Sequence, residues 1–303
     1  MAPDRAAGPG APLESEPAPA KVNLTLRVLG RRSDGYHALD SLVAFASIGD
    51  TLALAPAADL ALRVAGETAA AAGPPEENLV LVAARALARR RPDLQFGHFS
   101  LEKRLPVAAG LGGGSADAAA ALRLLARLNG LAADDPDLMA AARDAGADVP
   151  VCLDPRGRRM GGIGERLSPP LALPPLPAVL VNPGVALPTR EVFAALAAPP
   201  LRAGTAAPPG IGGAASAGAG LGDLLAALAE EPNDLEPPAI RLRPVIAAVL
   251  AALRACPGCR LARMSGSGAT CFGLFERPET AAQAAARLAA DQPGWWIRAC
   301  TLA

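Results

Sequence analysis

The sequence has few lysines, few aromatic residues and no excess charge of either sign. Its 303 residues include 29 basic and 29 acidic side chains, so the formal net charge is zero at pH 7. Proteins that bind nucleic acids or anionic membranes usually carry a basic excess that this chain lacks. We therefore expect neither nucleic acid nor a membrane as a partner.

Long hydrophobic runs are also missing. No apolar stretch approaches the roughly 18 residues that a membrane-spanning helix needs. Residues 1–17 are rich in proline and alanine, and they lack the basic start and apolar stretch of a secretory signal. We predict that this segment is a disordered tail and that the protein is cytoplasmic.

The cysteines do not form a recognisable pairing pattern. There are five of them, and an odd number in such a chain argues against a disulfide framework. Cys256 and Cys259 form a single CxxC pair, whereas a structural zinc site needs four ligands. We expect neither disulfides nor a zinc site.

Glycine, by contrast, is concentrated in one informative run, PVAAGLGGGSADAAAA at residues 106–121. Glycine allows a backbone to approach a ligand closely, and the alanine-rich stretch after Ser115 has helical spacing. The free N–H groups and the dipole of a helix start favour an anion, which predicts a phosphate-binding loop. It is not a Walker A loop, because no Gly-Lys-Ser/Thr ends it. The alternative is a glycine-rich turn that only begins a helix.

The scarce residue types draw attention to a few positions. Lys21 and Lys103 are the only lysines, and the only tyrosine, Tyr36, adjoins one of two histidines, His37. Alternation in AKVNLTLRV predicts a half-buried strand over 20–28, with Lys21 and Asn23 on the same face. Asp148 lies in GADVP, in a short turn before a proline. A surface lysine and a turn aspartate are the ordinary readings of Lys21 and Asp148.

The pattern of segments indicates an α+β fold. We expect strands at 20–28, 41–47, 51–55, 59–64, 98–104 and 178–182, with two more around an SGSG loop in 260–276 and one at the end. Helices are expected at 78–90, 115–128, 136–144, 223–230 and 237–254, with others near 188 and before the last strand. We divide the chain into domains at 18–160 and 161–303, and the low-complexity stretch 199–222 reads as a surface insertion.

The glycine run resembles the phosphate-binding motif of the GHMP kinases, named after galactokinase, homoserine kinase, mevalonate kinase and phosphomevalonate kinase. Matching segments in the same order include APAKVNL (18–24), GRRSDGYH (30–37), GADVPV (146–151), NDLE (233–236) and SGSGAT (265–270). The DGYH segment is similar to that of family members acting on a cytidine diphosphate-linked substrate. The resemblance covers residues 18–303.

This resemblance implies a two-lobed fold with the active site in the cleft between the lobes, and ATP-dependent phosphorylation of a hydroxyl group. It implies Asp148 as the catalytic base and Lys21 as its electrostatic partner. ATP would be bound by Pro106, Gly110, Leu111, Gly112, Gly113, Gly114, Ser115, Gly266, Ser267 and Gly268. Mg²⁺ would accompany ATP near Ser115.

The same resemblance implies the contacts of the second substrate. Tyr36 and Phe193 would sandwich a cytosine, His37 would read its polar edge, and Asn23 would line the acceptor end. By spacing alone, Phe193 reads as a core residue of an amphipathic helix. His98 reads as a structural residue of an apolar strand. We expect a monomer or a weak homodimer.

Three alternatives stay open at this point. Two are relatives within the superfamily: a homoserine or mevalonate-type kinase, and a decarboxylase that phosphorylates its substrate transiently. The third is a catalytically silent nucleotide-binding protein. The presence of DGYH argues against the relatives, and the presence of both Lys21 and Asp148 argues against a silent protein.

Overall fold

The computed structural model describes residues 14–202 and 220–303, which form a mixed α+β structure. The strands are β1 (Glu14–Asn23), β2 (Arg27–Arg31), β3 (His37–Ala57), β4 (Ala61–Ala65), β5 (Phe96–Glu102), β6 (Arg158–Gly162), β7 (Arg166–Leu167), β8 (Leu176–Asn182), β9 (Cys259–Met264), β10 (Cys271–Phe275) and β11 (Trp296–Leu302). The helices are α1 (Leu79–Ala88), α2 (Gly113–Leu128), α3 (Pro136–Ala145), α4 (Val149–Cys152), α5 (Thr189–Leu196), α6 (Leu221–Glu230), α7 (Glu236–Leu242), α8 (Val245–Arg254) and α9 (Pro278–Asp291). Two short 3-10 turns lie at Ala69–Ala71 and Pro75–Glu77.

The strands form one connected sheet, and β3 is its longest member. The sheet follows the order β4-β5-β3-β11-β8-β10-β9, while β1, β2 and β6 also pair with β3. Among pairs of the strands named above, only β4–β5 is parallel. The strands predicted at 41–47 and 51–55 are therefore one continuous strand of 21 residues.

The first strand begins earlier than the sequence suggested. β1 starts at Glu14, where its register with β3 begins, so residues 14–17 are not a disordered tail. Glu16 also binds Arg123 and Arg127 of α2, at 2.7 Å in each case. Because these partners are distant in the sequence, local composition did not predict that the strand includes residues 14–17. The remainder of the predicted tail, residues 1–13, lies outside the described part of the chain.

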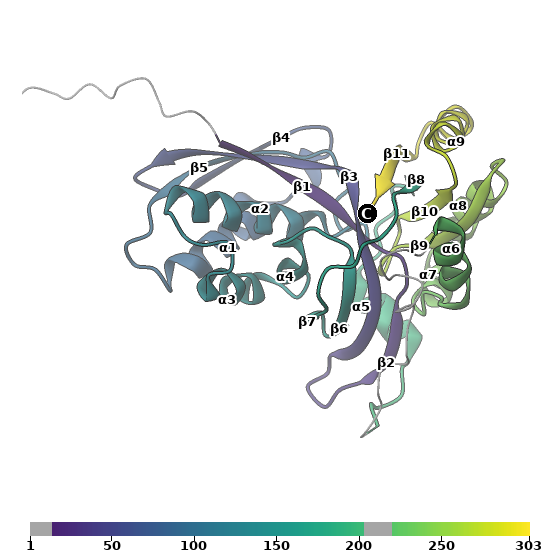
Figure 1. Ribbon diagram of the computed structural model, residues 1–303, viewed down its shortest axis with the longest axis horizontal. Coiled ribbons are helices and arrows are strands. Elements are labelled where there is room, and N and C mark those ends of the chain that lie inside the picture. The colour runs from purple at the N-terminus through teal and green to yellow at the C-terminus, as the bar shows by residue number, and fades with distance from the viewer. Residues whose placement is uncertain (1–13, 203–219) are drawn as a thin grey trace, which may run out of the picture.

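Helices cover the sheet in two groups, one from each half of the chain (Figure 1). α1 to α4 pack beside β1, β3 and β5, and they enclose one hydrophobic cluster. α7, α8 and α9 enclose a second cluster with β8 to β10. A third cluster, which includes Val22, Leu42, Leu180, Leu224 and Phe272, joins the two halves through the middle of the sheet. The expected two-lobed α+β arrangement is confirmed.

Prolines and chain breaks account for the other differences from the predicted elements. The strand predicted over 20–28 is interrupted after Asn23 and resumes at Arg27. Arg243 and Pro244 divide the helix predicted over 237–254 into α7 and α8. Asp148 is the N-cap residue of α4, and Pro150 occupies the first turn of that helix, where its missing N–H costs nothing.

The predicted insertion lies largely outside the described residues, and the predicted domain boundary falls within a strand. Of residues 199–222, 203–219 lie outside the described part, whereas Leu201 hydrogen-bonds to Arg31 and Leu221 begins α6. The boundary between residues 160 and 161 falls within β6, which pairs with β3 and with β7. The division into two independent domains therefore stays a prediction. No helix in residues 14–202 and 220–303 is long and apolar enough to cross a membrane.

Candidate active site

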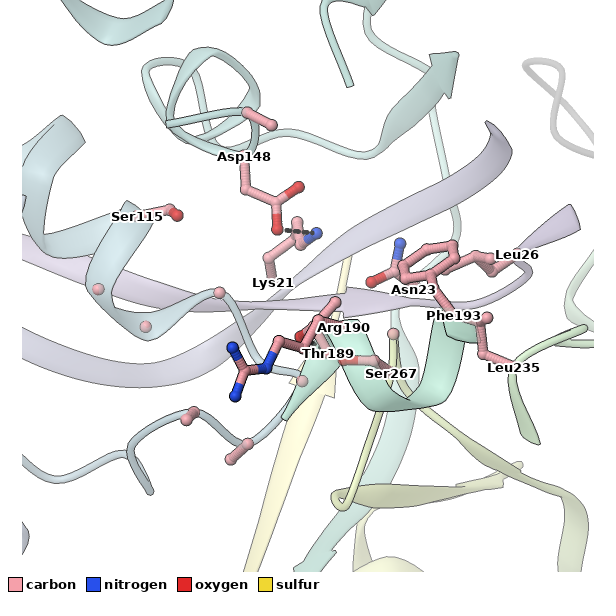
Figure 2. Close-up of a pocket in the computed structure, with 18 of the residues that line it drawn as sticks. Lys21, Asn23, Leu26, Ser115, Asp148, Thr189, Arg190, Phe193, Leu235 and Ser267 are labelled. Atoms are coloured by element: carbon pink, nitrogen blue, oxygen red, sulfur yellow. Dashed lines mark hydrogen bonds and ion pairs between the residues drawn. The ribbon is translucent and has the colours of Figure 1, made fainter. Parts of the chain in front are cut away.

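A cavity of about 1070 Å³ lies where the two halves of the chain meet. The first half contributes β1, the ends of β2 and β3, and the loop that leads into α2; the second half contributes α5 and the loop at 266–267. Figure 2 shows side chains from both halves directed into it. The predicted site residues that line the cavity are Lys21, Asn23, Tyr36, His37, Pro106, Gly110, Gly112, Gly113, Gly114, Ser115, Asp148, Phe193, Gly266 and Ser267.

The two predicted catalytic side chains form an ion pair in this cavity. Lys21 Nζ lies 2.9 Å from Asp148 Oδ2, and the side chains are 4% and 37% exposed (Figure 2). The prediction of a half-buried strand is wrong here, because every residue from 20 to 26 is buried, so both faces of this part of the chain are covered. The second oxygen of Asp148 has no partner among the described residues, so it is available to a ligand.

The glycine loop ends in a helix start with free backbone donors. Gly112 adopts a left-handed conformation with φ of +61° and forms the N-cap of α2 without a side-chain cap. The first helical hydrogen bond runs from the N–H of Ala116 to the carbonyl of Gly112. The N–H groups of Gly113, Gly114 and Ser115 therefore have no helical acceptor, and the helix dipole adds positive potential beside them. This geometry suits a phosphate group.

The second glycine loop, at 265–268, is tied directly to the first. Ser265 Oγ donates to the Gly110 carbonyl at 2.8 Å and accepts the N–H of Asn23 at 3.1 Å. A Cβ on Gly110 would lie 2.4 Å from the Ser265 carbonyl oxygen, so only glycine permits this approach. Asn233, from the NDLE segment, donates to the carbonyls of Met264 and Gly266, at 2.8 Å each. Hydrogen bonds and close packing thus join the two loops.

Two of the predicted ATP-binding residues do not line the cavity. Leu111 is buried, and its carbonyl accepts the N–H of Lys21 at 2.8 Å. Gly268 donates its N–H to the Ser265 carbonyl at 3.0 Å. Both therefore position other site residues rather than facing the cavity.

A buried charge cluster beneath the glycine loop was not predicted. Lys103 Nζ contacts Asp50 Oδ2 at 2.5 Å and Asp117 Oδ2 at 2.8 Å. Burial raises the pKa of Asp117 to about 7, although Lys103 opposes this shift, and Asp117 Oδ1 has no hydrogen-bond partner. Burial lowers the pKa of Lys103, but the two carboxylates outweigh that effect and raise it overall. The scarcity of lysine was the signal that could have identified this cluster.

A side chain at Gly113 would point toward this cluster. A Cβ built on Gly113 would lie 3.4 Å from a Leu105 methyl and 3.5 Å from Asp50 Oδ2 and Lys103 Nζ. A larger residue at this position would therefore disturb the buried charges. Its effect on a bound phosphate would be indirect.

The residues predicted to bind a base lie together at another part of the cavity. The rings of His37 and Phe193 are stacked, with centroids 4.6 Å apart and an interplanar angle of 23°. Tyr36 is 61% exposed beside them. Burial, followed by the charge of Arg31, lowers the pKa of His37, so its imidazole is neutral near pH 7 and can both donate and accept. The sandwich of a base between Tyr36 and Phe193 stays a prediction.

Asn23 lies between these two regions, and the nitrogen of its side-chain amide already forms a hydrogen bond. Its Nδ2 donates to Ser41 Oγ at 2.8 Å. A Cβ on Gly266 would lie 3.3 Å from Asn23 Oδ1, so the oxygen end of the amide faces the second glycine loop. His98 is remote from this site: it is exposed and pairs with Asp59 at 2.8 Å.

Other polar groups line the cavity, although the sequence did not assign them to the site. Glu77, Asn78, Arg31 and Arg190 all contribute to its wall. Asn78 was expected only as a helix cap, and its side chain does accept the N–H of Val80 at 3.0 Å. The arginines could not be singled out in a chain whose basic residues are nearly all arginine.

The residues present fit a magnesium ion that is held mainly by a nucleotide. Among residues 14–202 and 220–303 there is no group of three or more His, Cys, Asp or Glu side chains that could hold a metal. Mg²⁺ typically takes one or two protein ligands together with phosphate oxygens and water. The Ser115 hydroxyl at the start of α2 has no partner in the described chain, and it faces the cavity (Figure 2).

Comparison with known proteins agrees with this geometry. Residues 78–154 match the GHMP kinases N terminal domain, and residues 230–293 match the GHMP kinases C terminal family. The chain is 61% identical over 288 residues to the 4-diphosphocytidyl-2-C-methyl-D-erythritol kinase of Xanthobacter autotrophicus, covering 93% of this chain and 96% of the relative. It is 60% identical to the enzyme of that name from Methylobacterium radiotolerans, covering 94% and 97%.

Solved structures give the same result. A crystal structure of 4-(cytidine 5'-diphospho)-2C-methyl-D-erythritol kinase matches with a TM-score of 0.76 at 40% identity, covering 95% of this chain and 99% of that one. A homoserine kinase from Cytophaga hutchinsonii matches with a TM-score of 0.70 at 19% identity, covering 98% and 96%, which supports the fold alone. By its fold, its paired site residues and these identities, the chain belongs to the 4-diphosphocytidyl-2-C-methyl-D-erythritol kinase family of the GHMP kinases.

Proposed function

We propose that this protein transfers the γ-phosphoryl group of ATP to the 2-hydroxyl of 4-diphosphocytidyl-2-C-methyl-D-erythritol, a step of the non-mevalonate route to isoprenoid precursors. The observation that carries the proposal is the Lys21–Asp148 ion pair, with its 2.9 Å separation, inside the cavity that the glycine loop enters. A hydroxyl acceptor needs a nearby base, and phosphoryl transfer otherwise depends on positioning and charge stabilisation.

In the proposed step, the free carboxylate oxygen of Asp148 accepts the proton of the acceptor hydroxyl. The hydroxyl oxygen then forms a bond to the γ-phosphorus, and the bond from that phosphorus to the β–γ bridging oxygen breaks. ADP leaves with the electron pair of that bond. Lys21 orients Asp148 and stabilises the negative charge that develops on the transferred group.

The nucleotide would bind with its phosphates over the start of α2. The free N–H groups of Gly113, Gly114 and Ser115 would donate to phosphate oxygens. Mg²⁺, held by those phosphates and the Ser115 hydroxyl, would neutralise part of their charge. The acceptor would bind with its cytosine near Tyr36, His37 and Phe193, where a neutral imidazole can read a polar base edge.

The setting of the reaction is part of the same proposal. Free cysteines and the use of ATP fit the cytoplasm. We also expect a monomer or a weak homodimer, since residues from one chain supply both ends of the cavity. A homoserine or mevalonate-type activity is less favoured, because those substrates would leave the aromatic and imidazole groups without a base to bind.

The decisive experiment supplies the purified protein with Mg²⁺, ATP and one acceptor at a time. Phosphorus NMR of the product with 4-diphosphocytidyl-2-C-methyl-D-erythritol should show a new phosphomonoester and stoichiometric ADP. Its uridine analogue, homoserine and mevalonate serve as matched acceptors and should react poorly. Turnover of homoserine or mevalonate, without turnover of the cytidine compound, would overturn the substrate assignment and leave the fold and the catalytic pair in place.

A further inference from the structure

The lysine and arginine side chains that line the cavity differ in whether they form ion pairs. Among the described residues, those that line it are Lys21, Lys103, Arg31 and Arg190. Both lysines are held by carboxylates, Lys21 by Asp148 and Lys103 by Asp50 and Asp117. Neither arginine makes an ion pair within residues 14–202 and 220–303. Of the lysines and arginines that line the cavity, only the two arginines are therefore free to pair with a bound triphosphate.

The two free arginines lie at different ends of the cavity. Arg31 pairs in register with His37 and lowers its pKa, which places it at the end assigned to the base. Arg190 is the second residue of α5, and its neighbour Thr189 hydrogen-bonds through Oγ1 to Ser267 Oγ at 2.8 Å. Since the 265–268 loop is bonded to Gly110, the start of α5 lies at the phosphate end. Arg190 is thus the uncommitted cation at that end.

The orientation of Arg190 agrees with this placement. Figure 2 shows its side chain leaving the start of α5 with the guanidinium directed toward the loop that leads into α2. A guanidinium offers two parallel donors that match two oxygens of one phosphate, and it holds its charge at every accessible pH. The backbone donors of the helix start and the side-chain donors of Arg190 could thus contact the same group.

We propose that Arg190 binds a phosphate group of the donor nucleotide, so that this group is held jointly by the glycine loop and by α5. The inference rests on the proposed function for the presence of a donor nucleotide in the cavity. The acceptor also carries phosphates, which a guanidinium would bind by the same chemistry. The direction of the guanidinium toward the glycine loop assigns it to the donor.

The test measures binding before it measures turnover. Calorimetry with a non-hydrolysable ATP analogue and, separately, with cytidine 5'-diphosphate gives the affinity at each end of the cavity for the parent protein, Arg190→Ala and Arg190→Lys. Loss of a charge-assisted contact should weaken the ATP analogue by about 10-fold or more in Arg190→Ala and by less in Arg190→Lys. Cytidine diphosphate should bind as it does to the parent. The dependence of ATP-analogue affinity on salt should also become shallower in Arg190→Ala.

Arg277→Ala is the matched control, because Arg277 is exposed, lies at the start of α9 and does not line the cavity. Its nucleotide affinity should equal that of the parent. Unchanged affinity of Arg190→Ala for the ATP analogue would overturn the inference, as would a loss confined to cytidine diphosphate. A parent protein that fails to phosphorylate the cytidine substrate, yet loses ATP-analogue affinity in Arg190→Ala, would refute the proposed function and support the role of Arg190.

Discussion

At the scale of single residues, the site depends on a carboxylate with one engaged and one free oxygen. Asp148→Asn keeps the shape of the side chain but cannot accept the acceptor proton. We expect kcat to fall by about 10²–10⁴-fold, the usual loss for a general base. Affinity for an ATP analogue, measured by calorimetry, should remain near that of the parent.

Asp59→Asn provides the control for this change, because Asp59 is exposed and pairs with His98, outside the cavity. Lys21→Ala should resemble Asp148→Asn. Lys21→Arg should also be slow, since a planar guanidinium cannot occupy the place of a compact ammonium between Asp148 and the glycine loop. Near-parent turnover by Asp148→Asn would remove it from the mechanism.

Recognition of the base is a second residue-scale property. Tyr36→Ala removes one stacking surface, which is worth roughly 1–3 kcal/mol per base, so KM for the cytidine substrate should rise by about 5- to 150-fold. KM for ATP should not change. His37→Ala should reduce the discrimination between cytidine and uridine acceptors, because activity with the cytidine compound falls. Steady-state kinetics with both acceptors test this, and an unchanged ratio would exclude His37 as the reader of the base edge.

At the scale of elements, the start of α2 couples nucleotide binding to the catalytic lysine. A Cβ on Gly112 would lie 3.2 Å from Lys21 Cε, and the position has φ of +61°. We expect Gly112→Ala to lower kcat as well as nucleotide affinity, because it strains the loop and displaces Lys21. Gly114→Ala is the comparison, since its Cβ would meet only a Leu79 methyl at 3.5 Å. Equal kinetics for the two variants would contradict this coupling.

The charge cluster behind α2 should give the protein a distinctive pH dependence. Burial holds the pKa of Asp117 at about 7, whereas the ordinary value is 3.8. Between these values the folded protein binds one more proton than the unfolded chain. Raising the pH through this window therefore lowers the free energy of unfolding, by at most about 1.4 kcal/mol per pH unit.

Asp117→Asn removes this titrating carboxyl group. The free energy of unfolding of the variant, relative to that of the parent, should therefore increase from about pH 5 to about pH 8. Urea denaturation across this range measures the difference, with the exposed Asp134→Asn as the control. A difference between Asp117→Asn and the parent that does not vary with pH would show that Asp117 does not titrate in this window.

At the scale of the whole molecule, the chemistry is confined to one cavity, and features elsewhere should be dispensable. Cys256 and Cys259 are hydrogen-bonded as thiols to the carbonyls of Ala252 and Leu261. Burial raises the pKa of both, that of Cys259 to about 11, so they are poor metal ligands and poor nucleophiles. The double variant with serine at both positions should retain activity within a few-fold. Metal analysis is the check, since zinc bound at one equivalent and lost in the variant would contradict it.

Local patterns predicted much of this molecule, and long-range contacts account for the rest. Asn78 as the cap of α1 and the glycine loop before α2 follow from short-range chemistry. Short-range chemistry does not predict the continuity of β3, because its middle is held by strands from distant parts of the chain. The same applies to the site: motifs located Lys21 and Asp148, but only the packing of α5 against the second glycine loop brings Arg190 to the first.

The burial of both lysines has a practical consequence for chemical labelling. Lys21 and Lys103 line the cavity, and each side chain is only 4% exposed. Outside the site, the terminal amine is thus the only amine that an acylating reagent can modify. The rate at which such a reagent modifies internal amines would report how often the cavity opens. Protection by added nucleotide would then measure occupancy without any enzymatic assay.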